Sequence, residues 1–201
     1  MAALALFLVL LLVSCSQGNP FLPDGAGYAE RKSGRVYRPL PANLEAAGRL
    51  AEYGRYDNED RGFTLVFYEV DGLDTAVWLC DERFRLYTSG EISFDPLTAT
   101  LTELLICDQT AGSVTKGVFS AEEHGATLAE ILRLVASGTP CEAPSGAITY
   151  ERRLKFSFVE LPSVYYCVDF YMWGDVACFY DRAVGRFVPV PEALVSFVQG
   201  K

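Results

Sequence analysis

Apolar and polar residues alternate in short segments through the middle of the chain, and turn residues separate these segments. Asp71-Gly72 and Asp81-Glu82 lie between segments that are rich in β-branched and aromatic residues. Alternation with a period of two is typical of a strand with one buried face, and Asp-Gly is a common hairpin turn. We therefore expect antiparallel strands at residues 63–70, 75–80, 84–88, 97–107 and 114–119.

The last third of the chain gives the clearest prediction of a sheet. Leu154, Phe156 and Phe158 alternate with polar residues, and the following segment is expected to bury one face in the same way. The residues predicted on that face are Val164, Tyr166, Val168, Phe170 and Met172. A turn at Trp173-Gly174 then leads to a predicted strand at 176–181. A loop at 182–185 leads to a second predicted strand at 187–190.

Asp169 is a carboxylate in the middle of a predicted strand, where it shares a face with Cys167 and Tyr171. With a two-residue turn at Trp173-Gly174, Asp169 would lie opposite Cys178. An acid on an apolar or aromatic face costs free energy unless it is paired or hydrated. This face is therefore either exposed to solvent or directed toward a ligand.

Three segments have the spacing of short helices. Asn43 can cap a helix through residue 53, and Thr127-Leu128-Ala129-Glu130 is a capping box before apolar residues at helical spacing. Gly138 ends that second helix, and Pro191 suits the first turn of a closing helix. The predicted fold class is α+β, mainly antiparallel β-sheet with two or three short flanking helices.

The two sheet-rich halves have turn residues at similar spacings. Asp81 precedes Arg83-Phe84 in the first half much as Asp181 precedes Arg186-Phe187 in the second, and a predicted helix begins each half. An internal duplication would explain this similarity. Turn residues that hairpins share for local reasons would explain it as well.

The chain begins with twelve uncharged apolar residues, Ala2 to Val13. A spanning helix needs roughly 20 such residues, so this run is too short to cross a membrane comfortably. Its length is typical of the apolar region of a signal peptide. Because no Lys or Arg precedes Arg31, an export signal of another kind stays open as the alternative.

The sequence Leu12-Val13-Ser14-Cys15 resembles the lipobox of bacterial lipoproteins. The resemblance covers the first fifteen residues and implies cleavage before Cys15 and attachment of diacylglyceryl and further acyl groups, such as palmitate, to that residue. Two or more chains give stable anchoring, because each buried methylene contributes about 0.8 kcal/mol. Ser16 in place of an Asp implies a mild preference for the outer membrane.

The sequence predicts three parts. Residues 1–14 form the signal peptide, and residues 15–38 form a flexible tether, since they contain many Pro, Gly and Ser residues and few periodic apolar residues. Residues 39–201 form a single globular α+β domain, a length that is sufficient to bury a core.

The net charge of −9 limits the possible partners. An acidic protein is a poor candidate for binding the phosphate backbone of nucleic acids, and it is not attracted to anionic lipid headgroups. We therefore expect no nucleic acid partner, and membrane association through the acyl chains on Cys15 alone.

Five cysteines remain beside Cys15, and an oxidising compartment would permit disulfides among them. They are Cys80, Cys107, Cys141, Cys167 and Cys178. The predicted register places Cys167 diagonal to Cys178, too far apart for a bond. Cys141, in a loop beside Pro140, is the freest to find a partner. The chain has no Cys-x-x-Cys and one His, so no zinc site is expected.

No grouping of catalytic residues is recognisable. His124, the single histidine, lies in the polar segment Glu122-Glu123-His124-Gly125, where a hydrated side chain is the simpler interpretation. The chain contains neither Gly-x-Ser-x-Gly nor a phosphate-binding Gly-rich loop. We assign no catalytic, cofactor-binding or metal-binding residue.

The leading hypothesis is a non-enzymatic, lipid-anchored envelope protein that binds a partner protein or an envelope ligand through its sheet face or loops. The alternatives are an envelope hydrolase that uses carboxylates such as Asp169, and a small barrel that carries an apolar ligand. Converging carboxylates in a deep pocket would favour the hydrolase, and a closed barrel with an apolar lumen would favour the carrier. A flat, exposed aromatic face would favour the binding protein.

Overall fold

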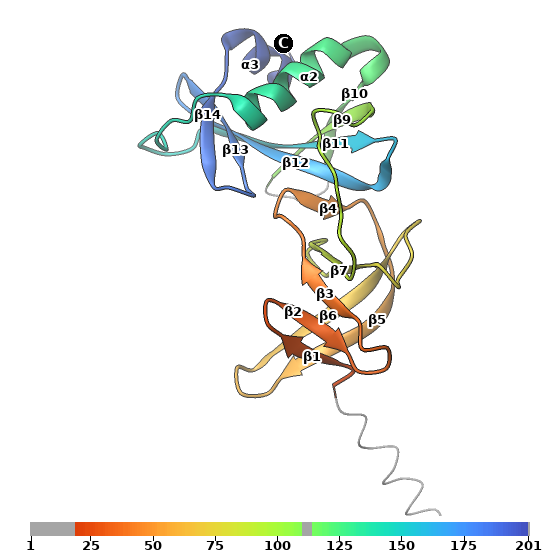
Figure 1. Cartoon of the computed structure of the whole chain (residues 1–201). Coiled ribbons are helices and arrows are strands. Elements are labelled where there is room, and N and C mark those ends of the chain that lie inside the picture. Colours follow the sequence, from red (N-terminus) through yellow and green to blue (C-terminus); the bar gives the residue numbers. More distant parts are fainter. Residues whose placement is uncertain (1–18, 110–113, 201) are drawn as a thin grey trace, which may run out of the picture.

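The computed structural model describes residues 19–109 and 114–200, which form two antiparallel sheets that follow each other along the chain (Figure 1). The predicted signal peptide and Cys15 lie outside the described residues. The α+β class, with mainly antiparallel sheet, is confirmed, and two helices are present in the described part. Neither of these helices is long and apolar enough to cross a membrane.

The N-terminal sheet has seven strands in the order β1-β2-β3-β8-β7-β6-β5. Its strands are β1 (Phe21–Asp24), β2 (Gly27–Glu30), β3 (Val36–Pro39), β5 (Arg49–Asn58), β6 (Phe63–Val70), β7 (Trp78–Asp81) and β8 (Leu86–Thr88). Asn19, just before β1, links the two edges of this sheet, because its side-chain amide exchanges two hydrogen bonds of 2.7 and 2.8 Å with the backbone of Asp57 on the other edge strand, β5.

The interior of the N-terminal sheet is filled by large side chains. Its core consists of Phe21, Tyr37, Phe67, Leu79 and Tyr87. The rings of Phe21 and Phe67 lie 4.5 Å apart, and those of Phe67 and Tyr87 lie 5.2 Å apart. Because these rings fill the interior of the curved sheet, that interior is a packed core rather than a lumen for a ligand.

The expectation of a flexible tether over residues 15–38 is wrong from residue 21 onward, where the chain forms β1, β2 and most of β3. Gly25 and Gly34 adopt positive φ angles of 58° and 72° in the turns after β1 and β2. The composition suggested a spacer because these turns need glycine. The segment is ordered because Phe21 and Tyr37 are buried in the aromatic core.

The helix predicted at residues 43–53 is also wrong, since this segment forms β4 (Leu44–Ala46) and the start of β5. Leu50, which a helix would have buried, is 54% exposed. Strand β4 pairs with Val164–Tyr166, about 120 residues further along the chain. A pairing over that distance leaves no local periodicity in the sequence, so the apparent helical spacing was misleading.

The C-terminal sheet has the order β10-β9-β11-β12-β13-β14, and β4 pairs with β12 beside this path. Its strands are β9 (Leu101–Cys107), β10 (Thr115–Ser120), β11 (Tyr150–Phe158), β12 (Leu161–Trp173), β13 (Val176–Asp181) and β14 (Arg186–Pro189). Strands β4 and β13 share one edge of the long strand β12. The chain thus joins the two sheets through β4 (Figure 1).

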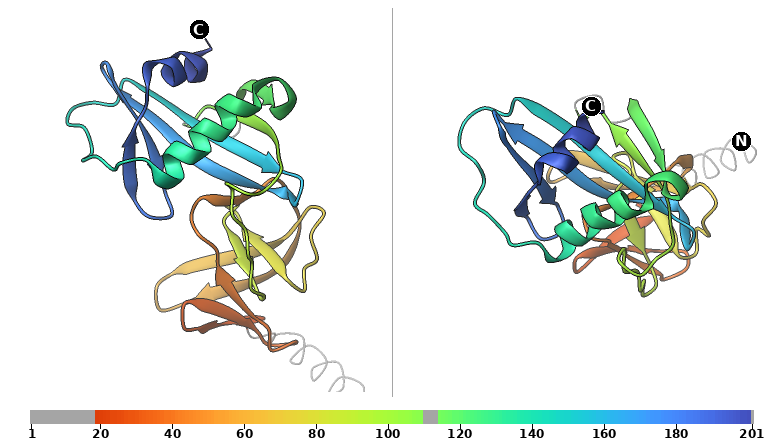
Figure 2. Two further views of the ribbon diagram at one scale, coloured as in Figure 1. Left: turned by 45° about the horizontal axis from the view of Figure 1, so that its top comes forward. Right: turned by 90° about the horizontal axis from the view of Figure 1, so that it is seen from above.

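Helices α2 (Ala121–Ser137) and α3 (Glu192–Gln199) both lie over one face of the C-terminal sheet (Figure 2). The predicted capping box at Thr127 is wrong as a helix start, because α2 begins six residues earlier. Ser120 is the cap, and its hydroxyl accepts a hydrogen bond from the backbone N–H of Glu123. Gly138 and Pro191 mark the end of α2 and the start of α3, as predicted.

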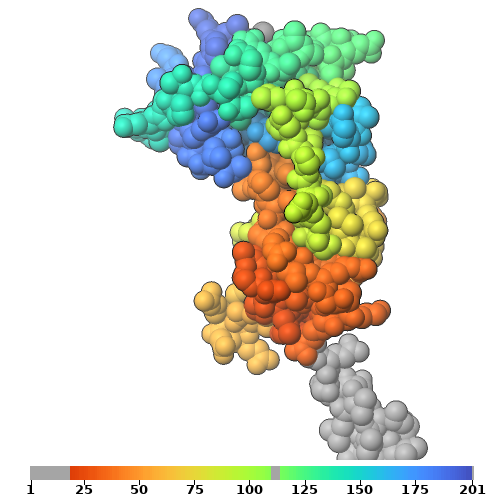
Figure 3. Space-filling model, in the orientation of Figure 1, coloured from red at the N-terminus to blue at the C-terminus, as the bar shows by residue number. Residues whose placement is uncertain are grey.

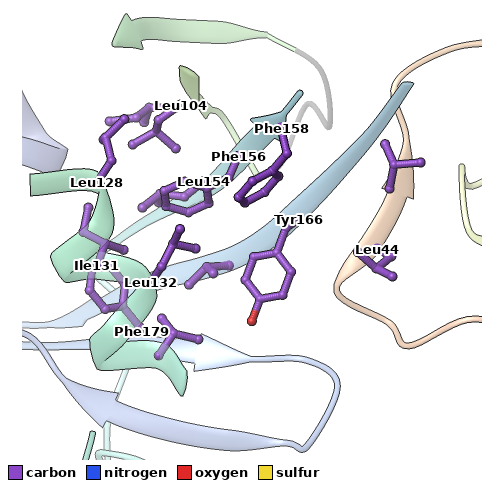
Figure 4. Close-up of a cluster of buried hydrophobic side chains, with 14 of the residues drawn as sticks. Leu44, Leu104, Leu128, Ile131, Leu132, Leu154, Phe156, Phe158, Tyr166 and Phe179 are labelled. Atoms are coloured by element: carbon purple, nitrogen blue, oxygen red, sulfur yellow. The ribbon is translucent and has the colours of Figure 1, made fainter. Parts of the chain in front are cut away.

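Apolar side chains of α2 and the sheet form the main core (Figure 4). Leu128 and Ile131 of α2 pack against the face that Leu154 and Phe156 line, and all four are fully buried. The alternation predicted for β11 and β12 is confirmed, since the members of both series are buried in the main core, except that Met172 is only partly buried. The buried members are Leu154, Phe156, Phe158, Val164, Tyr166, Val168 and Phe170.

The predicted turn at Trp173-Gly174 is wrong by one position, because Trp173 pairs with Val176 and the turn is Gly174-Asp175. Gly174 adopts a φ of +60°, which favours glycine at that position. Asp169 therefore lies opposite Tyr180, not Cys178 as predicted. The face assigned to Asp169 is unchanged, since shifting the pairing by two residues preserves the alternation.

Candidate functional site

The face of the C-terminal sheet opposite the helices carries a group of large side chains. We define the aromatic face as Tyr171, Trp173, Val176, Tyr180 and Phe187. These residues come from β12, β13 and β14, and their pairing register places them on one side of the sheet. The four rings are half-buried, and Val176 is 52% exposed.

The four rings contact one another across three strands. The ring centroids of Tyr180 and Phe187 lie 4.6 Å apart, those of Trp173 and Phe187 lie 5.8 Å apart, and those of Tyr171 and Trp173 lie 5.7 Å apart. The planes of these pairs are inclined by 34° to 75°. The rings therefore pack as a continuous tilted layer, a favourable arrangement for aromatic side chains.

A buried network of ion pairs lies beside the aromatic face. Glu45 on β4 accepts hydrogen bonds from Arg182 at 2.7 Å and from Arg153 at 3.1 Å, and its second oxygen lies 3.3 Å from the Lys155 ammonium. Asp169 accepts a hydrogen bond of 3.0 Å from Arg153. The guanidinium of Arg182 also lies 3.8 Å from Asp169. Arg153 and Arg182 each contact both carboxylates.

Strand pairing brings these charges together. Arg153 lies opposite Asp169, and Glu45 lies opposite Tyr165 on the neighbouring strand. Arg182 enters from the loop after β13, 137 positions after Glu45 in the sequence. The sequence analysis recognised Asp169 and the polar face of β11, but it missed Glu45, because it placed that residue on a helix.

The cations dominate the chemistry of Glu45. Burial alone would raise its pKa, but the charges of Arg153, Lys155 and Arg182 outweigh burial and lower the pKa of Glu45. Burial and the charge of Glu45 raise the pKa of the neighbouring Cys167 thiol well above its ordinary value. Glu45 therefore stays ionised and Cys167 stays protonated, which suits neither a general acid nor a thiolate nucleophile.

Tyr171 connects the ion pairs to the aromatic face. Its hydroxyl lies 3.5 Å from the second oxygen of Asp169, and it accepts a hydrogen bond of 2.7 Å from the side-chain amide of Gln109. Burial, followed by the charge of Asp169, raises the pKa of Tyr171. A neutral hydroxyl held in this way fixes the orientation of the ring within the face.

His124 lies within the first two turns of α2 rather than before the helix. Its imidazole packs against the rings of Phe119 and Phe197, at 5.3 and 5.6 Å, and its side chain is 38% exposed. The partly hydrated environment agrees with the interpretation of a surface residue. No nucleophile is hydrogen-bonded to His124 in the part of the chain that the structure describes.

A polar groove lies at the edge of the N-terminal sheet, far from the aromatic face in sequence. Its lining includes Glu30, Glu52 and Asp57. Each carboxylate is already engaged, because Glu30 accepts hydrogen bonds from Ser33 and Tyr53, Glu52 pairs with Arg55, and Asp57 accepts one from Thr64. Residues 19–109 and 114–200 contain no group of three His, Cys, Asp or Glu residues that could hold a metal ion.

Comparisons with protein-family models, with curated proteins and with solved structures give no match to this chain. The aromatic face and the ion-pair network are therefore interpreted from their own geometry.

Proposed function

We propose that this chain is a non-enzymatic binding protein of the bacterial cell envelope that presents its aromatic face to a protein partner. The observation that carries the proposal is the layer of four half-exposed rings with Val176 beside it. Tyr and Trp side chains contribute large, rigid contact areas, and they are enriched among the residues that dominate binding energy at protein interfaces.

The surroundings of the face favour a protein over a glycan. Recognition of a sugar requires free polar groups beside the rings, but Asp169 and Arg153 are bonded to each other. The rings are inclined toward one another rather than presented as parallel platforms. An apolar face whose neighbours Asp169 and Arg153 are already paired with each other suits the buried centre of a protein interface.

The alternatives have less support. A hydrolase would need a carboxylate that can exchange a proton, whereas Glu45 and Asp169 are each held by two or more cations. A carrier would need an apolar lumen, and the interior of the N-terminal sheet is filled by Phe21, Tyr37 and Phe67.

The ion-pair network supports the face as a rigid base. Arg153 and Arg182 tie β4 to the strands of the aromatic face, and Tyr171 rests on Asp169. A surface that is already ordered loses less conformational entropy when a partner binds. The molecule narrows at β4 and leaves a concave outline beneath β13 and β14 (Figure 3), where a partner has room to approach.

The proposal includes a lipid anchor at Cys15, which rests on the resemblance of Leu12-Val13-Ser14-Cys15 to the lipobox. The described chain starts at the end of the molecule opposite α2 and α3 (Figure 1). An anchor attached there would place the N-terminal sheet nearest the membrane and the C-terminal sheet, with its aromatic face, farther from it. The preferred location is the outer membrane.

Photo-crosslinking in the host tests the partner. A photoreactive residue at Val176 should give a discrete protein adduct, and a Trp173→Ala substitution should abolish it. The matched control is Val118 on the edge strand β10, a valine that is 60% exposed, and it should give no such adduct. Equal labelling at both positions, or no adduct at Val176, contradicts the proposal. If the protein sediments with peptidoglycan and the Trp173→Ala variant does not, the ligand of the aromatic face is a glycan rather than a protein.

The anchor has a separate test, the intact mass of protein extracted from host membranes. A species that starts at Cys15 and carries the added mass of acyl groups is expected, and Cys15→Ala should abolish it. A soluble species that is cleaved elsewhere and is unaffected by the substitution would contradict the anchor while leaving the aromatic face to be tested.

A further inference from the structure

Two of the five cysteines in the described part of the chain approach each other beside the aromatic face. The sulfur atoms of Cys141 and Cys178 lie 3.8 Å apart. Cys178 is on β13, opposite Tyr171 on one side and Pro189 on the other. Cys141 lies in the connection between α2 and β11, where its backbone N–H donates to the carbonyl of Phe187 at 3.0 Å. That hydrogen bond holds the connection against the edge strand β14.

We infer that Cys141 and Cys178 form a disulfide in an oxidising compartment. A disulfide has a sulfur–sulfur distance of about 2.04 Å, so the sulfur atoms must approach by less than 2 Å. Cys141 can make that movement, because it lies in an irregular segment after Gly138 and Pro140 rather than in a strand. Cys178 stays in place within the sheet. The inference does not need the proposed protein partner, but it rests on the proposed location in the cell envelope, where disulfides can form.

The two sulfur atoms differ in their exposure to solvent, and this difference decides which thiol reacts first. Cys178 is almost fully buried and Cys141 is partly exposed. Burial and the adjacent Cys141 raise the pKa of Cys178 to about 12, so its thiolate is scarce at neutral pH. Cys141 is therefore the first nucleophile.

The oxidant is the disulfide of a thiol oxidoreductase or of oxidised glutathione. The Cys141 thiolate attacks that disulfide and releases one thiolate, which leaves Cys141 in a mixed disulfide. The Cys178 sulfur, after losing its proton, then attacks Cys141 and displaces the second thiol. The two protein thiols lose two electrons and two protons, and the oxidant becomes two thiols.

The bond would tie the connection at residues 138–149 to the strand that carries Tyr180 of the aromatic face. It closes a loop of 37 positions, which contains the whole of β11 and β12. Closing a loop of this length restricts the unfolded chain, and the melting temperature should rise by about 10 °C. Among the described residues, three further cysteines are buried and not bonded to another cysteine, and they are Cys80, Cys107 and Cys167.

Peptide mapping of the full-length chain in detergent, exposed to oxidised glutathione, tests this inference. We expect a peptide that links Cys141 to Cys178, and a melting temperature that falls by about 10 °C on reduction. The Cys141→Ser variant should lose this dependence on reductant, whereas the control Cys107→Ser should retain it. Free thiols at both positions after oxidation, or a bond from Cys178 to another cysteine, overturns the inference even if a variant fails to fold.

Discussion

Two meanders of four consecutive antiparallel strands, β5–β8 and β11–β14, share their local chemistry and differ in what covers them. In each, the third strand ends in an aspartate, Asp81 or Asp181, that accepts a hydrogen bond from the backbone N–H two residues later. The similar spacing of turn residues in the two halves thus reflects a turn that both meanders contain. Asp favours such turns for local reasons.

The coverage of the two meanders gives their aromatic residues different roles. In the first meander, β3 and β1 extend the sheet, and their residues Tyr37 and Phe21 pack with Phe67 and Tyr87, which are almost completely buried. In the second, α2 covers one face, and the rings of Tyr171 and Trp173 stay half-exposed on the other. The same residue types form a core in one half and a candidate binding surface in the other, so the number of aromatic residues does not indicate function.

The largest expected effect on stability is that of Phe67→Ala, and comparing it with Trp173→Ala tests whether the two sets of aromatic residues have different roles. Phe67→Ala should lower the free energy of unfolding by about 3–5 kcal/mol, because it empties a fully buried site between Phe21 and Tyr87. Trp173→Ala should lower it by only about 1 kcal/mol, since that ring is half-exposed. Urea denaturation followed by circular dichroism measures both. Equal losses would show that the aromatic face is a core feature rather than a surface for binding.

The ion-pair network ties β4 to the other strands of the C-terminal sheet, and Glu45→Ala tests that role. Removing Glu45 leaves Arg153, Lys155 and Arg182 short of a counter-charge in a buried site, which should cost about 3 kcal/mol. The control is Glu52→Ala in the exposed pair with Arg55, expected to cost less than about 0.5 kcal/mol. If thermal melting shows the same small change for both variants, β4 is held to β12 without the network.

Acid should weaken the same connection. The pKa of Glu45 is lower in the folded protein than in the unfolded chain, so its contribution to stability is complete above the unfolded value, near 4.5. That contribution is lost as the pH falls below 4.5 and through the folded pKa. The wild type should therefore lose more stability than Glu45→Gln between pH 5 and pH 3 in denaturation series. Parallel losses in the two proteins would assign the acid sensitivity to other carboxylates.

The smallest effect concerns α2, which covers the second meander; the residues that the structure describes place no helix over the first. Ser120→Ala removes the side-chain cap of this helix and should cost about 1 kcal/mol. Thr127→Ala, at the position where the sequence predicted the helix start, should be neutral or slightly stabilising, because Ala is the better residue inside a helix. A larger loss for Thr127→Ala would contradict the position of the cap. Thermal melting compares the two.

Local patterns located many elements. The strands that bury Leu154, Phe156, Val168 and Phe170 follow from the alternation of apolar residues, and α3 follows Pro191 as expected. The start of α2 was within reach as well, because Ser120 and Glu123 have the spacing of a capping box. The candidate site was predicted only in part, as the face that carries Asp169 and Tyr171.

The sequence by itself determined where most strands run and which of their residues share a face, because a period of two and the turn residues are local properties. Only the tertiary structure decided that β4 pairs with β12, that Asn19 bonds to Asp57 across the two edges of the first sheet, and that Glu45 contacts Arg182. Those contacts join residues far apart in the chain, and they form because each edge strand and each buried charge requires a partner. The covering of one sheet face by helices decided that the other face kept its aromatic rings half-exposed.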